Sequence, residues 1–217
     1  MGQLLIKLSN RQPQRLANAL TGFTEAAVGL QRYALALQTN RRLTQIRPKE
    51  AVVWFNQGWL LNELGHKTKA IACYDAALAI QPDYHEALTN KGAALSALGQ
   101  HEAAIACFDA ALAIQPDDHH ALDNRGYALT KAGCYSEAIS SFDQAIKLNL
   151  SYANAIYNKA YCLSLMGDLI GAFAHLRQSF EIDPQYRDLA KTDTDFDPIR
   201  HDERFRALGE GGGKREG

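Results

Sequence analysis

The stretch ACYDAALAIQPD at residues 72–83 decides the fold, because it returns with small changes at a regular spacing along the chain. The later copies are ACFDAALAIQPD at 106–117, SSFDQAIKLNLS at 140–151 and HLRQSFEIDPQ at 175–185. Self-similarity at a period of about 20 to 50 residues is typical of stacked supersecondary units. The period therefore predicts four units, at residues 51–84, 85–118, 119–152 and 153–186.

Each unit is predicted to consist of two helices joined by a turn. Its large apolar residues are spaced by three, four and seven positions, which is the spacing of one helix face. A glycine midway through the unit can end the first helix in the left-handed conformation, and a proline closes the second helix. The glycines are Gly65, Gly99, Gly133 and Gly167, and the prolines are Pro82, Pro116 and Pro184.

Small, aromatic and proline residues follow one order in these units. Gly58, Ala70, Tyr74, Ala77 and Pro82 of the first unit return as Gly92, Ala104, Phe108, Ala111 and Pro116 in the second. This order, together with the length of the period, resembles the tetratricopeptide repeat. The resemblance implies an all-α fold, a right-handed α-solenoid of stacked helix-turn-helix units whose concave groove binds protein segments. Ala160 replaces the fourth glycine and Leu150 the third proline, without altering this prediction.

The flanking segments, residues 1–50 and 187–217, are predicted to cap the two ends of the stack. We interpret residues 17–50 as a degenerate repeat or a helical hairpin, because Ala36 and Pro48 stand one full period before Ala70 and Pro82. An organellar targeting peptide is an alternative for this acid-poor segment, although it has no serine-rich stretch. The C-terminal segment is expected to hold a capping helix, with Asp197 as N-cap, Pro198 next, and Ile199, Phe205 and Leu208 for burial, and then a disordered tail.

The composition of the chain indicates an ordinary globular protein of 217 residues. It shows neither an apolar run long enough to span a membrane nor a cleavable leader, which predicts a cytoplasmic location. The four cysteines are expected to be reduced and buried, because they form no CxxC pair and Cys73 and Cys107 would lie one helical layer apart. Seven histidines without helical i, i+4 pairing predict no metal site. We find no catalytic constellation, so the sequence predicts neither an enzyme nor a cofactor.

Charge is distributed unevenly along the chain, although its net value is −1. Residues 1–50 carry eight Lys and Arg against two glutamates, whereas residues 85–118 carry one lysine against five acidic residues. The basic segment is interpreted as a solvated surface. Binding of nucleic acid or another anionic surface through this segment is the alternative, and it would depend strongly on salt. The acidic middle of the chain argues against it.

An asparagine recurs in every unit two residues before the small residue of the first helix. These are Asn56, Asn90, Asn124 and Asn158. The family resemblance implies that the first helices line the concave groove and that this position faces into it. Each amide can donate two hydrogen bonds and accept two, which suits a peptide backbone. The alternative is that the amides bond to neighbouring helices. The residue after each asparagine is polar, which predicts a place at the edge of a layer.

Aromatic and acidic side chains are predicted on the same wall. The candidate peptide-binding set is completed by Phe55, Trp59, Asp123, Tyr127, Tyr157 and Tyr161. Of these, Tyr127 and Tyr161 are equally well interpreted as core residues. The family's carboxylate clamp for chaperone tails is incomplete in every window of three units. The predicted function is a non-enzymatic scaffold with a protein or peptide partner. A regulatory or assembly subunit of an enzyme complex is a further alternative.

Overall fold

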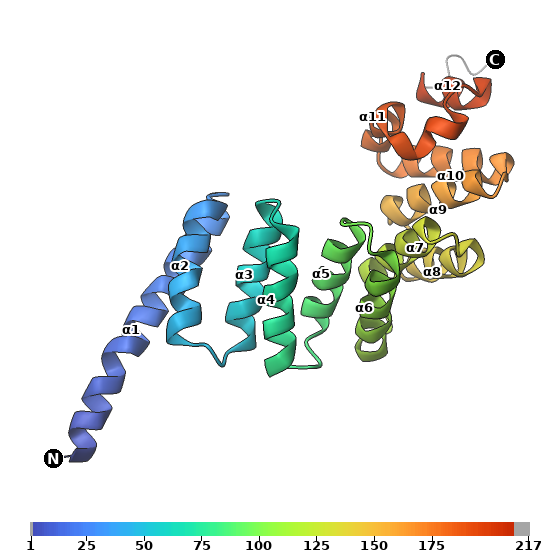
Figure 1. Cartoon of the computed structure of the whole chain (residues 1–217). Helices are drawn as coiled ribbons and strands as arrows, with labels where there is room; N and C mark the ends of the chain where they lie inside the picture. The colour runs from blue at the N-terminus through green and yellow to red at the C-terminus, as the bar shows by residue number, and fades with distance from the viewer. Residues whose placement is uncertain (1, 211–217) are drawn as a thin grey trace. The chain divides into compact units, whose positions relative to one another are not determined.

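The computed structural model describes the backbone of residues 2–210 and the side chains from residue 14 to residue 210 (Figure 1). Every regular element in this range is a helix, which confirms the predicted all-α class. Most of the glycine-rich tail that was predicted to be disordered, residues 211–217, lies outside the described residues. The chain divides into two compact units, Met1–Ile114 and Gln115–Gly217.

The first unit consists of three helical hairpins. Each hairpin packs on the next, because α2 contacts α3 and α4 contacts α5. The helices are α1 (Gly2–Gly29), α2 (Tyr33–Ile46), α3 (Ala51–Glu63), α4 (Lys67–Ile80), α5 (His85–Ser96) and α6 (His101–Ile114). The first hairpin covers α3 and thereby shields the apolar face that stacking leaves at this end of the unit.

The second unit consists of two hairpins followed by three short helical elements. The hairpins are formed by α7 with α8 and α9 with α10, and α8 packs on α9. The elements are α7 (His119–Lys131), α8 (Tyr135–Leu148), α9 (Ala153–Leu165), α10 (Leu169–Ile182), α11 (Gln185–Thr192), the 3₁₀ helix η1 (Thr194–Ile199) and α12 (Glu203–Gly209). The short elements cover one end of this unit, since η1 contacts α9 and α11 and α12 contact α10.

The first helices of successive repeats contact one another, α3 with α5 in the first unit and α7 with α9 in the second. The corresponding second helices, α4 and α6 or α8 and α10, approach each other less closely. Within each unit the first helices therefore lie on the concave side of the stack. We call the surface formed by α1, α3 and α5, and likewise that formed by α7 and α9, the inner surface of its unit.

Glycine in the first helix of a repeat is required by an aromatic ring in the second. A Cβ atom added at Gly58 would lie 2.6 Å from Cε1 of Tyr74, and one at Gly126 would lie 2.6 Å from Cε1 of Phe142. Both rings are fully buried, so they have no free space to retreat into. In the last repeat Ala160 is paired with the smaller, non-aromatic Leu176 at the ring position.

The predicted helix-ending glycines adopt the left-handed conformation, with φ between 76° for Gly99 and 81° for Gly133 and Gly167. In the N-terminal hairpin the same place, one period before Gly65, is occupied by Gln31 with φ of 55°. The backbone of the first hairpin thus turns as the repeats do. A side chain replaces the glycine there, which costs conformational energy.

At two of the four places after the asparagines, a lysine forms an ion pair between successive repeats. Lys91 Nζ lies 2.6 Å from Oδ1 of Asp75 on the preceding repeat, and Lys159 Nζ lies 2.6 Å from Oδ1 of Asp143. In both pairs the aspartate belongs to the second helix of the repeat before. The ammonium groups of these two lysines therefore link successive repeats.

Two local predictions were wrong. Cys134 is exposed rather than buried, because it is the N-cap residue in the turn that follows Gly133; the other three cysteines are buried and all four are free thiols. Asp197 lies inside η1 and does not cap the last helix, which is capped by the Asp202 carboxylate. Pro198 lies inside the 3₁₀ helix η1 instead of starting an α-helix, while Ile199 and Phe205 are buried as predicted and Leu208 is partly buried.

Candidate functional site

The inner surface of the first unit contains a groove between α1 and α3. It has a volume of about 410 Å³ and is lined by Thr24, Glu25, Val28, Gly29, Asn56, Trp59 and Leu60. Two of the sequence-predicted binding residues, Asn56 and Trp59, thus lie in one cavity. We call it the α1–α3 groove.

The walls of the α1–α3 groove differ in chemistry. Trp59 is held edge-on against Tyr33, with ring centroids 5.6 Å apart and planes at 88°, so its indole has a fixed orientation. Val28 and the buried Leu60 add aliphatic surface. Asn56 is exposed, and its amide makes no hydrogen bond to any other described residue. The groove therefore combines an apolar surface with free amide donors and acceptors.

Phe55 and Asn90 take other positions in the first unit. The Phe55 ring packs between two tyrosines, with centroid distances of 6.0 Å to Tyr74 and 5.1 Å to Tyr84, and does not line the groove. Asn90 is partly buried, and its Nδ2 donates to the backbone oxygen of Glu86 at 2.8 Å, one turn earlier in α5. One donor of Asn90 is therefore used within its own helix.

On the inner surface of the second unit, Asp123 is the centre of a hydrogen-bonded network. Asn158 Nδ2 donates to Asp123 Oδ1 at 2.9 Å, Tyr152 Oη donates to Oδ2 at 3.1 Å, and Asn154 Nδ2 also donates to Oδ2. Tyr186 of α11 in turn donates to Asn154 at 3.0 Å. The predicted pair Asp123 and Asn158 is thus brought together, but the two residues bond to each other.

Burial determines the electrostatics of this network. Asp123 is only 1% exposed, and desolvation raises the pKa of its carboxyl above the ordinary value, although the three side-chain donors act in the opposite direction. The pKa of Tyr152 is also raised, first by burial and then by the nearby Asp123 charge. The Tyr152 hydroxyl is 2.9 Å from Nδ1 of His120, which connects the network to the exposed end of α7.

The C-terminal segment lies against the predicted tyrosines of the second unit. Tyr157 Oη donates to Asp193 at 2.8 Å and Tyr127 Oη donates to Asp195 at 3.2 Å. The ring of Phe196 packs edge-on against Tyr157 and Tyr161, which are both buried. η1 thus covers part of this inner surface.

Lys131 joins the same contacts and was not singled out from the sequence. Its Nζ donates to Asp195 at 2.6 Å and to the Tyr161 hydroxyl at 3.1 Å, and lies over the rings of Tyr127 and Tyr161. Burial opposes the charge, but the bonds to Asp195 and Tyr161 raise the pKa of Lys131 overall. No local pattern indicates this arrangement, because Asp195 stands 64 residues after Lys131 in the chain.

Asn124 is the remaining member of the predicted asparagine row. It is partly buried and makes no side-chain hydrogen bond to another residue in the part of the chain that the structure describes. Asn56 and Asn124 therefore keep their amides available, whereas Asn90 and Asn158 donate to protein oxygens. The structure thus divides the asparagine row into two pairs with different bonding.

Other classes of site were sought in the described residues. Within residues 14–210, no group of three or more His, Cys, Asp or Glu side chains is arranged to hold a metal ion. No helix among the described residues combines the length and apolar character needed to cross a membrane. The rings of His119 and His120 pack against each other and against Tyr152, so packing within the protein explains their positions.

Comparison with known families agrees with the repeat architecture. One profile of the tetratricopeptide repeat matches residues 85–118. A second profile of the same repeat matches residues 51–84, 119–152 and 153–186. These matches cover more than half of the chain, and the chain belongs to the tetratricopeptide repeat family. No sequence among the curated proteins compared matches it.

Solved structures share the fold at low sequence identity. MamA (residues 41 to the end) from Desulfovibrio magneticus RS-1 is 19% identical with a TM-score of 0.73, over 78% of this chain and 96% of that one. YrrB, described as a TPR protein with an unusual peptide-binding site, is 19% identical with a TM-score of 0.64, over 76% and 85%. TTC0263, a thermophilic TPR protein from Thermus thermophilus, is 21% identical with a TM-score of 0.65, over 80% and 94%. These likenesses concern the fold alone.

Proposed function

We propose that this protein is a non-enzymatic scaffold that binds an extended segment of a partner protein on the inner surface of its first unit, with the α1–α3 groove as the main contact. The observation that carries the proposal is the pairing of the fixed Trp59 indole with the unengaged Asn56 amide in one cavity. A peptide needs both an apolar contact for a side chain and partners for its backbone. Aromatic side chains held in place bury large area with little loss of rotamer freedom.

The remaining predicted residues receive different roles in this proposal. Asn56, Trp59 and the free donor of Asn90 contact the partner in the first unit, and Phe55 supports the surface from beneath. On the second unit, taken by itself, Asn124 and the partly exposed Tyr127 are the predicted residues that remain open to a partner. Asp123, Asn158, Tyr157 and Tyr161 are engaged inside the protein, and they hold that surface in shape.

The segments that flank the repeats belong to the proposal. Residues 1–50 cap the first repeat and also supply Thr24, Glu25 and Val28 to the groove. The described part of the C-terminal segment, residues 187–210, caps the last repeat. The description of YrrB as having a peptide-binding site supports peptide binding as a use of this fold. The proposal includes a cytoplasmic location, which fractionation of the native cells tests.

Site-specific crosslinking followed by titration tests the proposal. A photoreactive amino acid is placed at position 56 of the intact chain, and at position 144 on the outer helix α8 as control, where Gln144 is exposed. We expect a discrete protein crosslinked from position 56 and not from position 144. A synthetic peptide of the crosslinked segment should then bind Trp59→Ala at least about tenfold more weakly than wild type, as removal of an interface anchor does. Equal affinity of wild type, Asn56→Ala and Trp59→Ala for that peptide would refute the proposal.

A further inference from the structure

A second cavity lies in the second unit, away from its inner surface, between α10, α11 and α12. It has a volume of about 630 Å³, larger than the α1–α3 groove. Its apolar wall is formed by Phe173, Phe180 and Leu208, and three arginines line it: Arg177, Arg187 and Arg204. We call it the C-terminal groove. Nothing in the predicted binding set lies in it.

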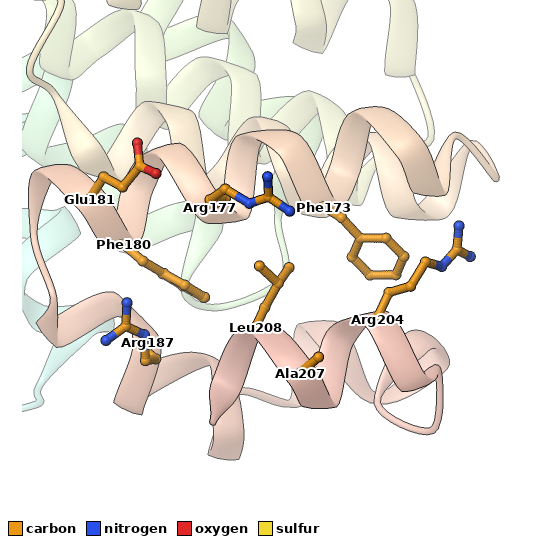
Figure 2. Close-up of a pocket in the computed structure, with 8 residues that line it drawn as sticks. All are labelled: Phe173, Arg177, Phe180, Glu181, Arg187, Arg204, Ala207 and Leu208. Carbon is orange, nitrogen blue, oxygen red and sulfur yellow. The ribbon is translucent and has the colours of Figure 1, made fainter. Parts of the chain in front are cut away.

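The close-up shows how these side chains are arranged. Phe180 and Leu208 extend into the space between the helices, with Arg177 above them on α10 and Arg187 below them on α11 (Figure 2). Arg204 lies at the opposite end, beside Phe173. The two arginines nearest the middle therefore stand on either side of an apolar contact surface.

The arginines differ in how far their hydrogen-bond donors are used. Arg204 is committed, because its Nε and Nη2 donate to the two carboxylate oxygens of Asp202 at 3.0 and 2.8 Å. Arg187 lies over the Phe180 ring with its guanidinium carbon 5.7 Å from the ring centre, and its buried Nε has no acceptor among the described residues. Arg177 is exposed and forms no ion pair with another described residue. Two guanidinium groups thus keep donors for an anion.

The contact with Phe180 prepares Arg187 for this role. A guanidinium held over an aromatic ring still has N–H groups to donate, and the ring limits the orientations that the side chain can take. Because fewer rotamers are lost on binding, a carboxylate is held more tightly than by a mobile lysine. Glu181 is the one acidic residue that lines the groove, and the three arginines outnumber it.

We propose that the C-terminal groove binds an acidic peptide segment in which a bulky apolar side chain stands between carboxylates. The apolar side chain packs on Phe180 and Leu208, and the flanking carboxylates pair with Arg177 and Arg187. Charge complementarity selects the acidic residues. The aromatic wall and the Glu181 carboxylate on the rim disfavour a densely charged polyanion such as a nucleic acid, which would offer nothing to the apolar surface.

A binding assay with the full-length chain tests this proposal. The probe is a library of fluorescein-labelled five-residue peptides with one Phe, Leu or Ile between two pairs of Asp or Glu, measured by anisotropy. We expect members of the library to bind wild type, and matched peptides with Asn and Gln in place of the acids to bind at least about tenfold more weakly. Arg187→Gln and Arg177→Gln should each weaken binding by a similar factor, and Arg187→Lys should weaken it less than Arg187→Gln.

The control variant is Arg206→Gln. It removes an exposed arginine of α12, the helix that also contains Arg204, and Arg206 does not line this groove. It should bind as wild type does, and circular dichroism should show that every variant is folded. Trp59→Ala should also bind normally, which separates this site from the α1–α3 groove. Absence of binding by the whole library would overturn the proposal. Equal binding by Arg187→Gln, or binding of a single-stranded oligonucleotide or anionic lipid vesicles in place of the peptides, would do the same.

Discussion

Gly92 lies so close to the ring of Phe108 that a Cβ atom at residue 92 would stand 2.7 Å from Cε1 of that ring. Real Cβ atoms do not approach another carbon so closely, and the Phe108 ring is fully buried. The glycine and the aromatic residue are therefore one steric unit. The last repeat contains the alternative solution, Ala160 with Leu176.

This relationship predicts the outcome of a double-mutant cycle. Gly92→Ala should lower the free energy of unfolding by about 1–3 kcal/mol through overpacking, and Phe108→Leu should lower it by a similar amount through lost ring contacts. The double variant reproduces the pairing of the last repeat, so it should be at least about 1 kcal/mol more stable than the sum of the single effects. Urea denaturation of the four proteins measures this coupling. Additive losses would show that residues 92 and 108 do not share a packing constraint.

Gln31 holds a backbone conformation that glycine holds in each of the four repeats. Its φ is 55°, and a side chain in the left-handed region costs roughly 1 kcal/mol. Glycine at this position would remove that cost, but its greater conformational freedom in the unfolded chain would offset part of the gain. We expect Gln31→Gly to raise the free energy of unfolding by about 0.5 kcal/mol and Gln31→Val to lower it. Gly65→Gln, the reverse exchange in the first repeat, should be destabilising. Thermal denaturation of the three variants checks these signs.

The repeat architecture could be predicted because a regular period records local contacts. Pairs such as Gly58 with Tyr74 and Lys91 with Asp75 join adjacent helices and return in register, so one unit explains the others. The prediction for Cys134 failed for a related reason, since a lone residue in a turn carries no periodic signal.

The candidate site was only partly predictable. The family resemblance implied that Asn56 faces the inner surface, but whether an amide is free depends on its neighbours in space. Asn158 bonds to Asp123 from 35 residues away, and Asp195 reaches Tyr127 from 68 residues away. Contacts of this kind leave no pattern in the sequence. The arginines of the C-terminal groove come from three different helices and were invisible for the same reason.

Asp123 should make the stability of the protein depend on pH. Its carboxyl has a raised pKa in the folded state, so between the ordinary value of 3.8 and the raised value the folded protein binds more protons than the unfolded chain. Stability from this residue is therefore present at low pH and is lost as pH rises through that range.

The variant Asp123→Asn provides the reference, since asparagine does not titrate. We expect the free energy of unfolding of wild type, relative to this variant, to fall as pH is raised from about 4 to about 7. Urea denaturation at several pH values measures the difference, and the other titrating groups are common to both proteins. A relative gain for wild type over this range would mean that the hydrogen bonds from Asn158, Asn154 and Tyr152 outweigh desolvation.

Two ion pairs of equal length but different burial, Asp195 with Lys131 and Asp188 with Lys191, can be compared to measure how much the C-terminal contacts stabilise the fold. Each carboxylate lies 2.6 Å from a lysine Nζ, Asp195 from Lys131 and Asp188 from Lys191. The environments differ, because the Asp195 and Lys131 side chains are 19% and 25% exposed while those of Asp188 and Lys191 are 81% and 51% exposed. Equal distances should therefore give unequal energies.

Asp195→Asn should lower the free energy of unfolding by about 1–3 kcal/mol, because it leaves the Lys131 ammonium partly buried between two tyrosine rings without its anion. Asp188→Asn should have a far smaller effect, since water already screens that exposed pair. Added salt should change the difference between these two stability losses only slightly, because burial shields the Lys131–Asp195 pair from screening by ions. Chemical denaturation at low and high ionic strength makes the comparison. Equal effects of the two substitutions would mean that η1 does not hold its place on α7 and α9 in solution, and the Asp193 contact to Tyr157 would then be lost with it.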